Sequence, residues 1–240
     1  MITEKTVSKA IYSVYQPIIQ LEDQAIIGYE ALTRGQGVGR YPQELFRRAY
    51  MDGMVISLDF ECLLSAIKVL PILGNGHLLF LNVEPMTLAR SFRAKHDGEF
   101  FLKKFAKYAE NIVFELTEGM KMSDFAYVKH AVTFLRRMGF RFALDDVADV
   151  GYKVLKLISL KPDFIKLDMS LVHGLREDRM HLLLIKRLTE EARACHARVV
   201  AEGVESEDEI EPLRKMGIEY AQGFYFGRPK KTLQRKPSNL

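Results

Sequence analysis

The sequence has no tryptophan, only two cysteines, and no apolar run approaching the roughly 18 residues needed to cross a bilayer. Cys62 and Cys195 are far apart along the chain, and neither has a second thiol nearby. We therefore expect structural thiols and no redox pair. The N-terminus also lacks the apolar core of a signal peptide. These absences predict a cytoplasmic protein without a membrane segment.

The excess of positive charge is small. The 240 residues include 35 Lys and Arg against 31 Asp and Glu, a formal net charge of +4. This imbalance is too weak to predict binding of a DNA or RNA polymer, although an anionic small ligand is compatible with it. The six histidines show no metal-ligand spacing, so we expect them on the surface and in loops.

Short apolar runs that end in polar residues alternate with helical patterns along most of the chain. Leu78–Leu81 ends at Asn82, for example, and a helical stripe begins at Phe125 and stops at Gly139. The strands are expected near residues 14–19, 26–32, 78–81, 112–114, 142–146, 164–167, 199–201 and 220–222. This alternation, with about eight repeats, predicts an α/β fold, a TIM-like (β/α)8 barrel.

The barrel is expected to be a single domain. Its core covers about residues 12–230, and no long linker or internal repeat interrupts it. Residues 231–240 are polar and basic, and we interpret them as a solvated tail.

Active sites of such barrels lie at the C-terminal ends of the strands. A single acid after a strand is more often a helix cap or an ion-pair partner, but recurrence at four strand ends favours a shared site. The polar residues at the strand ends, which we expect to converge on one mouth, are Glu30, Asn82, Glu115, Asp145, Lys166, Glu202 and Gln222.

Asp145 and Asp146 are adjacent, which places them on opposite faces of a straight strand unless the backbone turns after Leu144. With Asp146 included, five carboxylates at one mouth repel one another unless cations are present. Oxygen ligands suit Mg²⁺ or Mn²⁺ better than Zn²⁺ or copper, and two ions would share so many acids. Two hard cations beside a lysine indicate phosphoester hydrolysis.

Several sequence blocks, in this order, resemble those of the EAL domain family, phosphodiesterases that linearise cyclic di-GMP. They are Tyr15–Ile18, Tyr29–Arg34, Leu81–Val83, Glu115–Glu118, Leu144–Asp146, Lys166–Asp168, Val200–Glu205 and Ala221–Pro229. The resemblance covers nearly the whole chain. It implies a barrel with one antiparallel strand, a site for two metal ions, and hydrolysis of cyclic di-GMP to linear pGpG.

The resemblance also assigns roles. The implied ligands of the first metal are Glu30, Asn82, Glu115 and Asp145, and those of the second are Asp145 and Asp146. Lys166 resembles the residue that orients the attacking water and helps to deprotonate it. Glu202 and Gln222 complete the environment of the second metal and the water. The implied catalytic set is thus Lys166, Glu202 and Glu30.

Further matches concern the ligand and the loop after the two aspartates. The implied cyclic di-GMP contacts are Gln16, Leu32, Arg34, Asp168, Gln222 and Arg228. Phe226 and Pro229 are open to two interpretations, packing on a guanine face or in the core. Glu118 and Glu205 match acids that steady the loop.

That loop departs from the family pattern Phe-Gly-x-Gly-Tyr-Ser, because residues 147–153 read Val-Ala-Asp-Val-Gly-Tyr-Lys. Ala148 and Val150 stand where the family has glycines, so second-metal affinity and coupling within the expected homodimer are open. Two hypotheses follow: a metal-dependent phosphodiesterase, or a cyclic di-GMP receptor that signals through a protein partner. A protein-interaction module that binds no nucleotide has little support.

Overall fold

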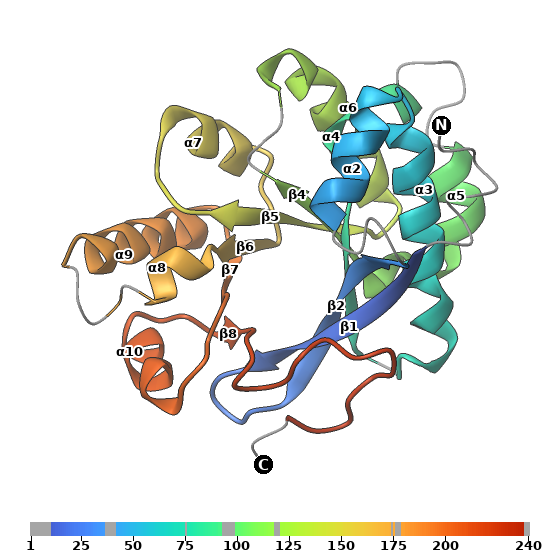
Figure 1. Cartoon of the computed structure of the whole chain (residues 1–240). Helices are drawn as coiled ribbons and strands as arrows, with labels where there is room; N and C mark the ends of the chain where they lie inside the picture. The colour runs from blue at the N-terminus through green and yellow to red at the C-terminus, as the bar shows by residue number, and fades with distance from the viewer. Residues whose placement is uncertain are drawn as a thin grey trace.

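The computed structural model describes residues 11–36, 42–74, 76–92, 99–117, 121–173, 175 and 179–237 (Figure 1). Eight strands form a closed barrel in chain order. They are β1 (Ile11–Gln20), β2 (Ile26–Gly35), β3 (Leu78–Asn82), β4 (Ile112–Thr117), β5 (Arg141–Val147), β6 (Phe164–Leu167), β7 (Arg198–Ala201) and β8 (Tyr220–Ala221). β1 runs antiparallel to β2 and β8, whereas the other neighbouring pairs are parallel. The predicted (β/α)8 barrel with one antiparallel strand is confirmed.

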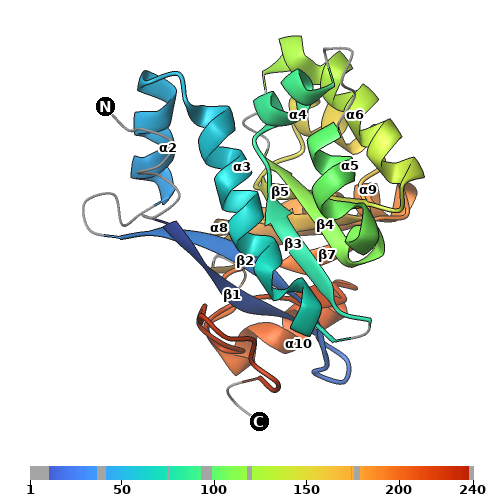
Figure 2. The same ribbon diagram turned by 90° about the vertical axis from the view of Figure 1, so that its right-hand side faces the viewer.

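Helices surround the barrel (Figure 2). They are α2 (Pro42–Met51), α3 (Val55–Ala66), α4 (Pro85–Ser91), α5 (Glu99–Phe105), α6 (Phe125–Arg137), α7 (Tyr152–Ile158), α8 (Met169–His173), α9 (Arg179–Ala194) and α10 (Ile210–Lys215). Shorter 3-10 turns are η1 (Ile67–Ile72), η2 (Ala106–Asn111), η3 (Met122–Asp124) and η4 (Glu207–Glu209). None of the helices described here is long and apolar enough to cross a membrane.

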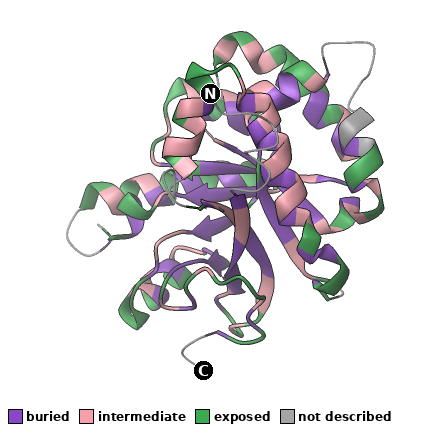
Figure 3. Ribbon diagram, turned by 45° about the vertical axis from the view of Figure 1, so that its right-hand side comes forward, coloured by how far each residue is buried: buried purple, intermediate pink, exposed green. Residues whose placement is uncertain are grey.

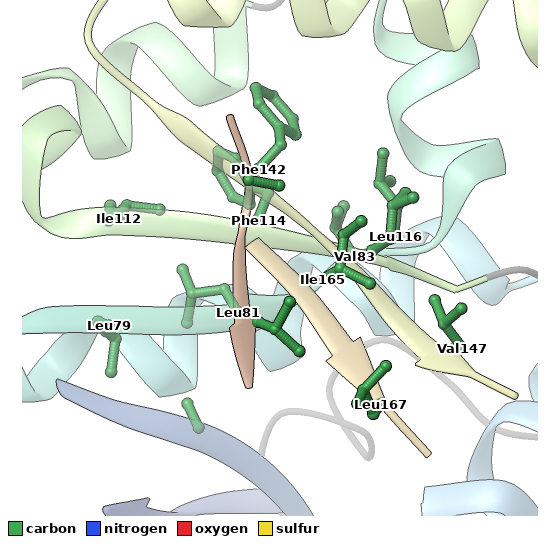
Figure 4. Packing of buried hydrophobic residues seen from close by; sticks show 14 of the residues in the cluster. Leu79, Leu81, Val83, Ile112, Phe114, Leu116, Phe142, Val147, Ile165 and Leu167 are labelled. Carbon is green, nitrogen blue, oxygen red and sulfur yellow. The ribbon is translucent and has the colours of Figure 1, made fainter. Parts of the chain in front are cut away.

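Alternation along the strands creates two apolar layers. Outward-facing side chains pack beneath the helices, as Leu81, Phe114, Phe142 and Ile165 do in Figure 4. Burial is accordingly concentrated on the strands and on the inner faces of the helices (Figure 3). Inside the barrel, one compact layer fills the middle: Ile18, Phe80, Val113, Ala143, Phe164, Val200 and Tyr220. This inner layer separates the two open ends of the barrel.

The C-terminal segment packs against the outside of β1, where Figures 1 and 2 both show it. The backbones of Lys230 and Tyr15 exchange hydrogen bonds of 2.7 and 3.0 Å. The Tyr29 hydroxyl donates to the carbonyl of Gln234, and the Gln234 side chain is buried. Within the expected tail, the basic side chains of Lys231, Arg235 and Lys236 are exposed, whereas Gln234 and Pro237 are buried.

Candidate active site

Lys166 on β6 lies at the centre of a cluster of acids. Its Nζ is 2.8 Å from Glu115 Oε1, 2.9 Å from Asp145 Oδ1, 2.8 Å from Glu202 Oε1 and 3.2 Å from Glu30 Oε2. Glu30 lies in the middle of β2, Glu115 and Asp145 lie in the C-terminal halves of β4 and β5, and Glu202 directly follows β7. The lysine side chain is completely buried. The structure thus brings together side chains that are up to 172 residues apart in the sequence.

Two amides join the acids to one another. Asn82 Nδ2 donates to Glu30 Oε1 at 3.0 Å and to Glu115 Oε2 at 3.1 Å. Gln222 Nε2 donates to Glu30 Oε2 at 2.6 Å and to Gln16 Oε1 at 3.1 Å. The Oε1 atom of Gln222 is buried without a hydrogen-bond donor in the described structure. An acceptor oxygen therefore remains available at the site.

A break in strand pairing explains how the adjacent Asp145 and Asp146 side chains reach the same mouth. The register between β5 and β6 shifts between Leu144 and Val147, and Asp146 has a left-handed backbone with φ of 57°. Asp is one of the residues that tolerate this conformation. The bulge turns the backbone where a straight strand would send the two side chains to opposite faces. Both carboxylates consequently line the same mouth.

The acids form two overlapping groups whose chemistry fits divalent cations. Carboxylate oxygens of Glu30, Glu115 and Asp145 lie within 4.8 Å of one another, as do those of Asp145, Asp146 and Glu202. Asp145 belongs to both groups. An all-oxygen donor set of this kind fits two neighbouring hard ions such as Mg²⁺ or Mn²⁺. Glu202, which the family resemblance put in the environment of the second metal without naming it a ligand, belongs to the second group.

The cluster holds more negative charge than one ammonium can balance. Burial lowers the pKa of Lys166, but Asp145, Glu115, Glu202 and Glu30 together raise it well above its usual value. Burial raises the pKa of Glu202 to about 8 and that of Asp146 to about 6, in each case against the attraction of Lys166. Such shifts are expected where acids are removed from water and lie close to like charges.

Glu115 and Glu30 respond differently to the same surroundings. Burial raises the pKa of Glu115 and outweighs the attraction of Lys166. Burial also acts to raise the pKa of Glu30, but Lys166, Gln222 and Asn82 lower it below its usual value. Glu30 accepts hydrogen bonds from the side-chain amides of Asn82 and Gln222, and these bonds favour its charged form. Glu115 accepts an amide hydrogen bond from Asn82 alone.

A hollow of about 550 Å³ opens over the cluster. Four of the expected ligand contacts line it: Gln16, Leu32, Asp168 and Gln222. Arg34 does not line it, and its Nη1 donates to the carbonyl of Thr33 at 2.8 Å. Arg228 stacks its guanidinium carbon 3.9 Å above the ring centre of Phe224, which does line the hollow. The two arginines therefore stand at the edge.

The aromatic residues near β8 have distinct positions. Phe226 is 1% exposed and belongs to the outer core, which excludes the interpretation that it stacks on a guanine. Phe224, by contrast, is 45% exposed at the mouth. Sequence reasoning did not separate the two, because both lie in the same short aromatic run after Gln222.

Asp59 on α3 is a residue of the hollow that sequence reasoning missed. It is 2% exposed, accepts a hydrogen bond from the backbone N–H of Glu84 at 3.1 Å, and lines the end of the hollow near α2. Burial raises its pKa to about 7. The available signal was an acid beside Leu58 and Cys62 on the apolar face of a predicted helix.

The loop after the bulge does not require the glycines that it lacks. Asp146 is the only residue from Asp145 to Lys153 with a positive φ, so Ala148 and Val150 are not strained. Asp149 Oδ1 accepts the N–H of Gly151 at 2.7 Å, and α7 begins at the next residue. The sequence did not predict this helix.

Of the two acids expected to stabilise the loop, Glu118 and Glu205, the structure describes only Glu205. Glu205 is exposed and lines the hollow, and its N–H donates to Glu209 Oε2 at 2.8 Å. Glu118 lies outside the described residues.

Known proteins have sequences similar to this chain. The EAL domain family model matches residues 2–229. The cyclic di-GMP phosphodiesterase PdeB of Shewanella oneidensis is 33% identical over 198 residues, covering 78% of this chain and 22% of the relative. This chain spans less than a third of the length of the curated relatives PdeA, PdeI, DosP and PdeB.

Solved structures are similar as well. A standalone EAL protein of Vibrio cholerae, bound to c-di-GMP, has a TM-score of 0.80 and 27% identity, covering 95% of this chain and 96% of that one. Klebsiella pneumoniae BlrP1, in a complex with calcium and the same dinucleotide, has a TM-score of 0.81 at 23% identity, covering 98% and 60%. The sequence, the barrel and the family match agree: this chain belongs to the EAL domain family.

Proposed function

We propose that this chain is a metal-dependent phosphodiesterase that hydrolyses cyclic di-GMP to linear pGpG. The main support is the pair of overlapping carboxylate groups that share Asp145 beside the buried ammonium of Lys166. The names of the relatives agree with this activity. The proposed domain is the whole chain, with its core at residues 12–230.

In this proposal Glu30, Asn82, Glu115 and Asp145 hold one Mg²⁺ or Mn²⁺ ion, while Asp145, Asp146 and Glu202 hold the other. When bound, the ions polarise the phosphoryl oxygens and favour deprotonation of a nearby water. Bound cations would favour the ionised carboxylates, against the burial and the mutual repulsion that raise several of their pKa values.

Lys166 would orient the attacking water, and Glu202 would accept a proton from it. The Nζ–H groups of Lys166 orient the water oxygen, and Oε1 of Glu202, 2.8 Å from Nζ, accepts its proton. The water oxygen forms a bond to phosphorus as the bond to the ribose 3′ oxygen breaks. That oxygen takes a proton from solvent, and Glu202 returns its own proton to solvent, which balances the step. Gln222 and Glu30 fix the geometry through their 2.6 Å hydrogen bond.

The hollow would bind the dinucleotide around this centre. Gln16, Leu32 and Asp168 contact it from the walls, while Arg34 and Arg228 reach its phosphates or bases from the edge by charge-assisted hydrogen bonds. Glu118 and Glu205 are assigned to loop support. Tyr152 and Leu155 on α7 are exposed beside the loop, and the expected homodimer remains a prediction that size determination in solution tests.

The test is turnover. The protein is incubated with cyclic di-GMP and either Mg²⁺ or Mn²⁺, and the products are separated by chromatography. Accumulation of pGpG with one of these metals, lost in Glu30→Gln, is the expected result. Absence of pGpG with both metals would reject the proposal.

The receptor hypothesis shares the binding site and differs in turnover. Its motivation is the altered sequence at residues 147–153. Calorimetry that detects tight cyclic di-GMP binding by a protein without phosphodiesterase activity would favour it, and a search for a protein partner would follow.

A further inference from the structure

The barrel has a second opening, at the N-terminal ends of the parallel strands. A hollow of about 600 Å³ lies there, lined by residues at or next to the ends of β1, β2, β3, β5, β6, β7 and β8. The inner apolar layer separates this hollow from the acidic cluster. The proposed phosphodiesterase reaction therefore gives no role to the side chains that line it.

Two arginines give this opening a charge opposite to that of the active site. Arg141 begins β5 and Arg198 begins β7, and both line the hollow. Side chains alternate along a strand, so Arg141 shares the inner face with Asp145, and Arg198 shares it with Glu202. A single apolar residue, Ala143 or Val200, lies between each pair. The barrel interior is thus acidic at one end and basic at the other.

These arginine charges are not neutralised by direct ion pairs, as far as the described residues extend. Asp163 is the one acid among the described residues that line the hollow, and it already accepts the N–H of Phe142 at 2.9 Å and Arg136 Nη2 at 3.1 Å. Glu219 lies beside the Tyr220 hydroxyl and is exposed. His77 and His196 contribute two further ring donors.

Both guanidinium groups are held in place. The carbon of Arg198 lies 5.9 Å from the ring centres of Phe164 and Tyr220, which form a buried aromatic floor. Arg141 Nη1 donates to the backbone carbonyl of Glu110. Arg198 is exposed, so its guanidinium group is accessible to a ligand.

A purely structural role accounts for part of this arrangement. Arg198 covers the aromatic floor and shields it from water, as an arginine stem often does. That role does not require a second arginine and two imidazoles around the same hollow. Guanidinium forks match the oxygens of phosphate in geometry and charge.

We propose that the N-terminal mouth of the barrel is a second binding site, which takes the phosphate group of a small anionic molecule. Arg141 and Arg198 bind the phosphate oxygens, and His77 and His196 donate from the rim. Phosphate can arrive free or attached to a larger molecule, so the probes are inorganic phosphate, pyrophosphate and AMP. Tighter binding of AMP than of inorganic phosphate and pyrophosphate would indicate that the natural ligand is an organic phosphate.

The experiment measures binding by calorimetry with EDTA present, so that residual cations do not recruit the probes to the acidic cluster. The variants are Arg141→Gln and Arg198→Gln. Arg90→Gln on α4 is the control, because it removes the same charge from an exposed position outside the hollow. We expect one site, weakened about tenfold or more by each variant, as for loss of a charged hydrogen bond. The control should bind like the wild type.

A second measurement uses the unaltered protein. Pyrophosphate should shift the imidazole nuclear magnetic resonance signals of His77 and His196 and leave that of His130 on α6 unchanged. If circular dichroism shows that Arg198→Gln does not fold, the imidazole shifts and the binding affinity of Arg141→Gln test the proposal without it. No binding, or binding that persists in both variants without imidazole shifts, would overturn the proposal.

Discussion

Lys166 Nζ and Glu202 Oε1 lie 2.8 Å apart at the boundary between the apolar barrel interior and the open mouth. The same ammonium also contacts three other carboxylates within 3.2 Å. One ammonium therefore contacts four carboxyl groups, and the cluster depends on Lys166 more than on any single acid. Divalent cations would relieve the same repulsion.

Replacement of Lys166 by Met should destabilise the metal-free protein and abolish turnover. The substitution leaves buried carboxylates without a counter-charge, a loss of about 3–5 kcal/mol for breaking a buried ion pair. Chemical denaturation with EDTA measures this cost. Addition of Mn²⁺ should recover part of the stability without restoring activity. Unchanged stability of Lys166→Met in EDTA would contradict the central role of the ammonium.

The metal-free protein should lose stability as pH rises from about 5 to 8. Burial raises the folded-state pKa of Glu202 to about 8, above its ordinary value of 4.5. Within this window the unfolded state has released a proton that the folded state still holds, so raising the pH favours unfolding. One such group contributes up to about 1.4 kcal/mol per pH unit.

Denaturant titrations at pH 5, 6, 7 and 8 check this dependence. With saturating Mn²⁺ the decline should be smaller or reversed, since cations favour the ionised acids. Stability that rises with pH in EDTA would show that Glu202 is not protonated in the folded protein.

The convergence of the site residues could be predicted because it follows from two simple rules. Polar residues at the ends of Leu78–Leu81, Ile112–Phe114 and Phe164–Ile165 must meet when parallel strands close into a barrel. The adjacent aspartates also signalled a backbone turn. Neither inference needed the register between strands.

What escaped prediction depends on tertiary contacts. The left-handed backbone of Asp146 accompanies a register shift between β5 and β6. Asp59 becomes a candidate site residue only because α3 packs beside the mouth of the barrel. The C-terminal segment has a polar composition, yet it covers β1 through backbone hydrogen bonds that no side-chain pattern reveals. Helix α7 is seven residues long, too short for its period to stand out.

Two substitutions at Asp146 should separate backbone geometry from charge. Asn tolerates the left-handed conformation, so Asp146→Asn should fold with nearly unchanged stability but bind the second cation more weakly. Ala lacks both properties, and Asp146→Ala should lose a further 1–2 kcal/mol or so because of the strained φ. Denaturation in EDTA measures the strain, and Mn²⁺ calorimetry measures the affinity. Equal stability of the two variants would contradict the geometric argument.

Phe224 and Phe226 offer a matched pair, because the same substitution should have different effects two residues apart. Phe226→Ala removes a ring that is 1% exposed and should cost about 3–5 kcal/mol of unfolding free energy. Phe224→Ala removes a ring that is 45% exposed at the hollow, so its stability should change little. If the hollow binds cyclic di-GMP, loss of this stacking face should weaken binding by roughly tenfold, within the 1–3 kcal/mol typical of base stacking.

Thermal melting and calorimetry with cyclic di-GMP and Ca²⁺ distinguish the two positions. Arg228→Gln is the companion variant, since its guanidinium lies on the ring of Phe224 and outside the lining of the hollow. If Phe224 contacts the base directly, Arg228→Gln should weaken binding less than Phe224→Ala does. Equal losses would show that the stacked pair acts as one unit, and unchanged binding in both variants would place the bases elsewhere in the hollow.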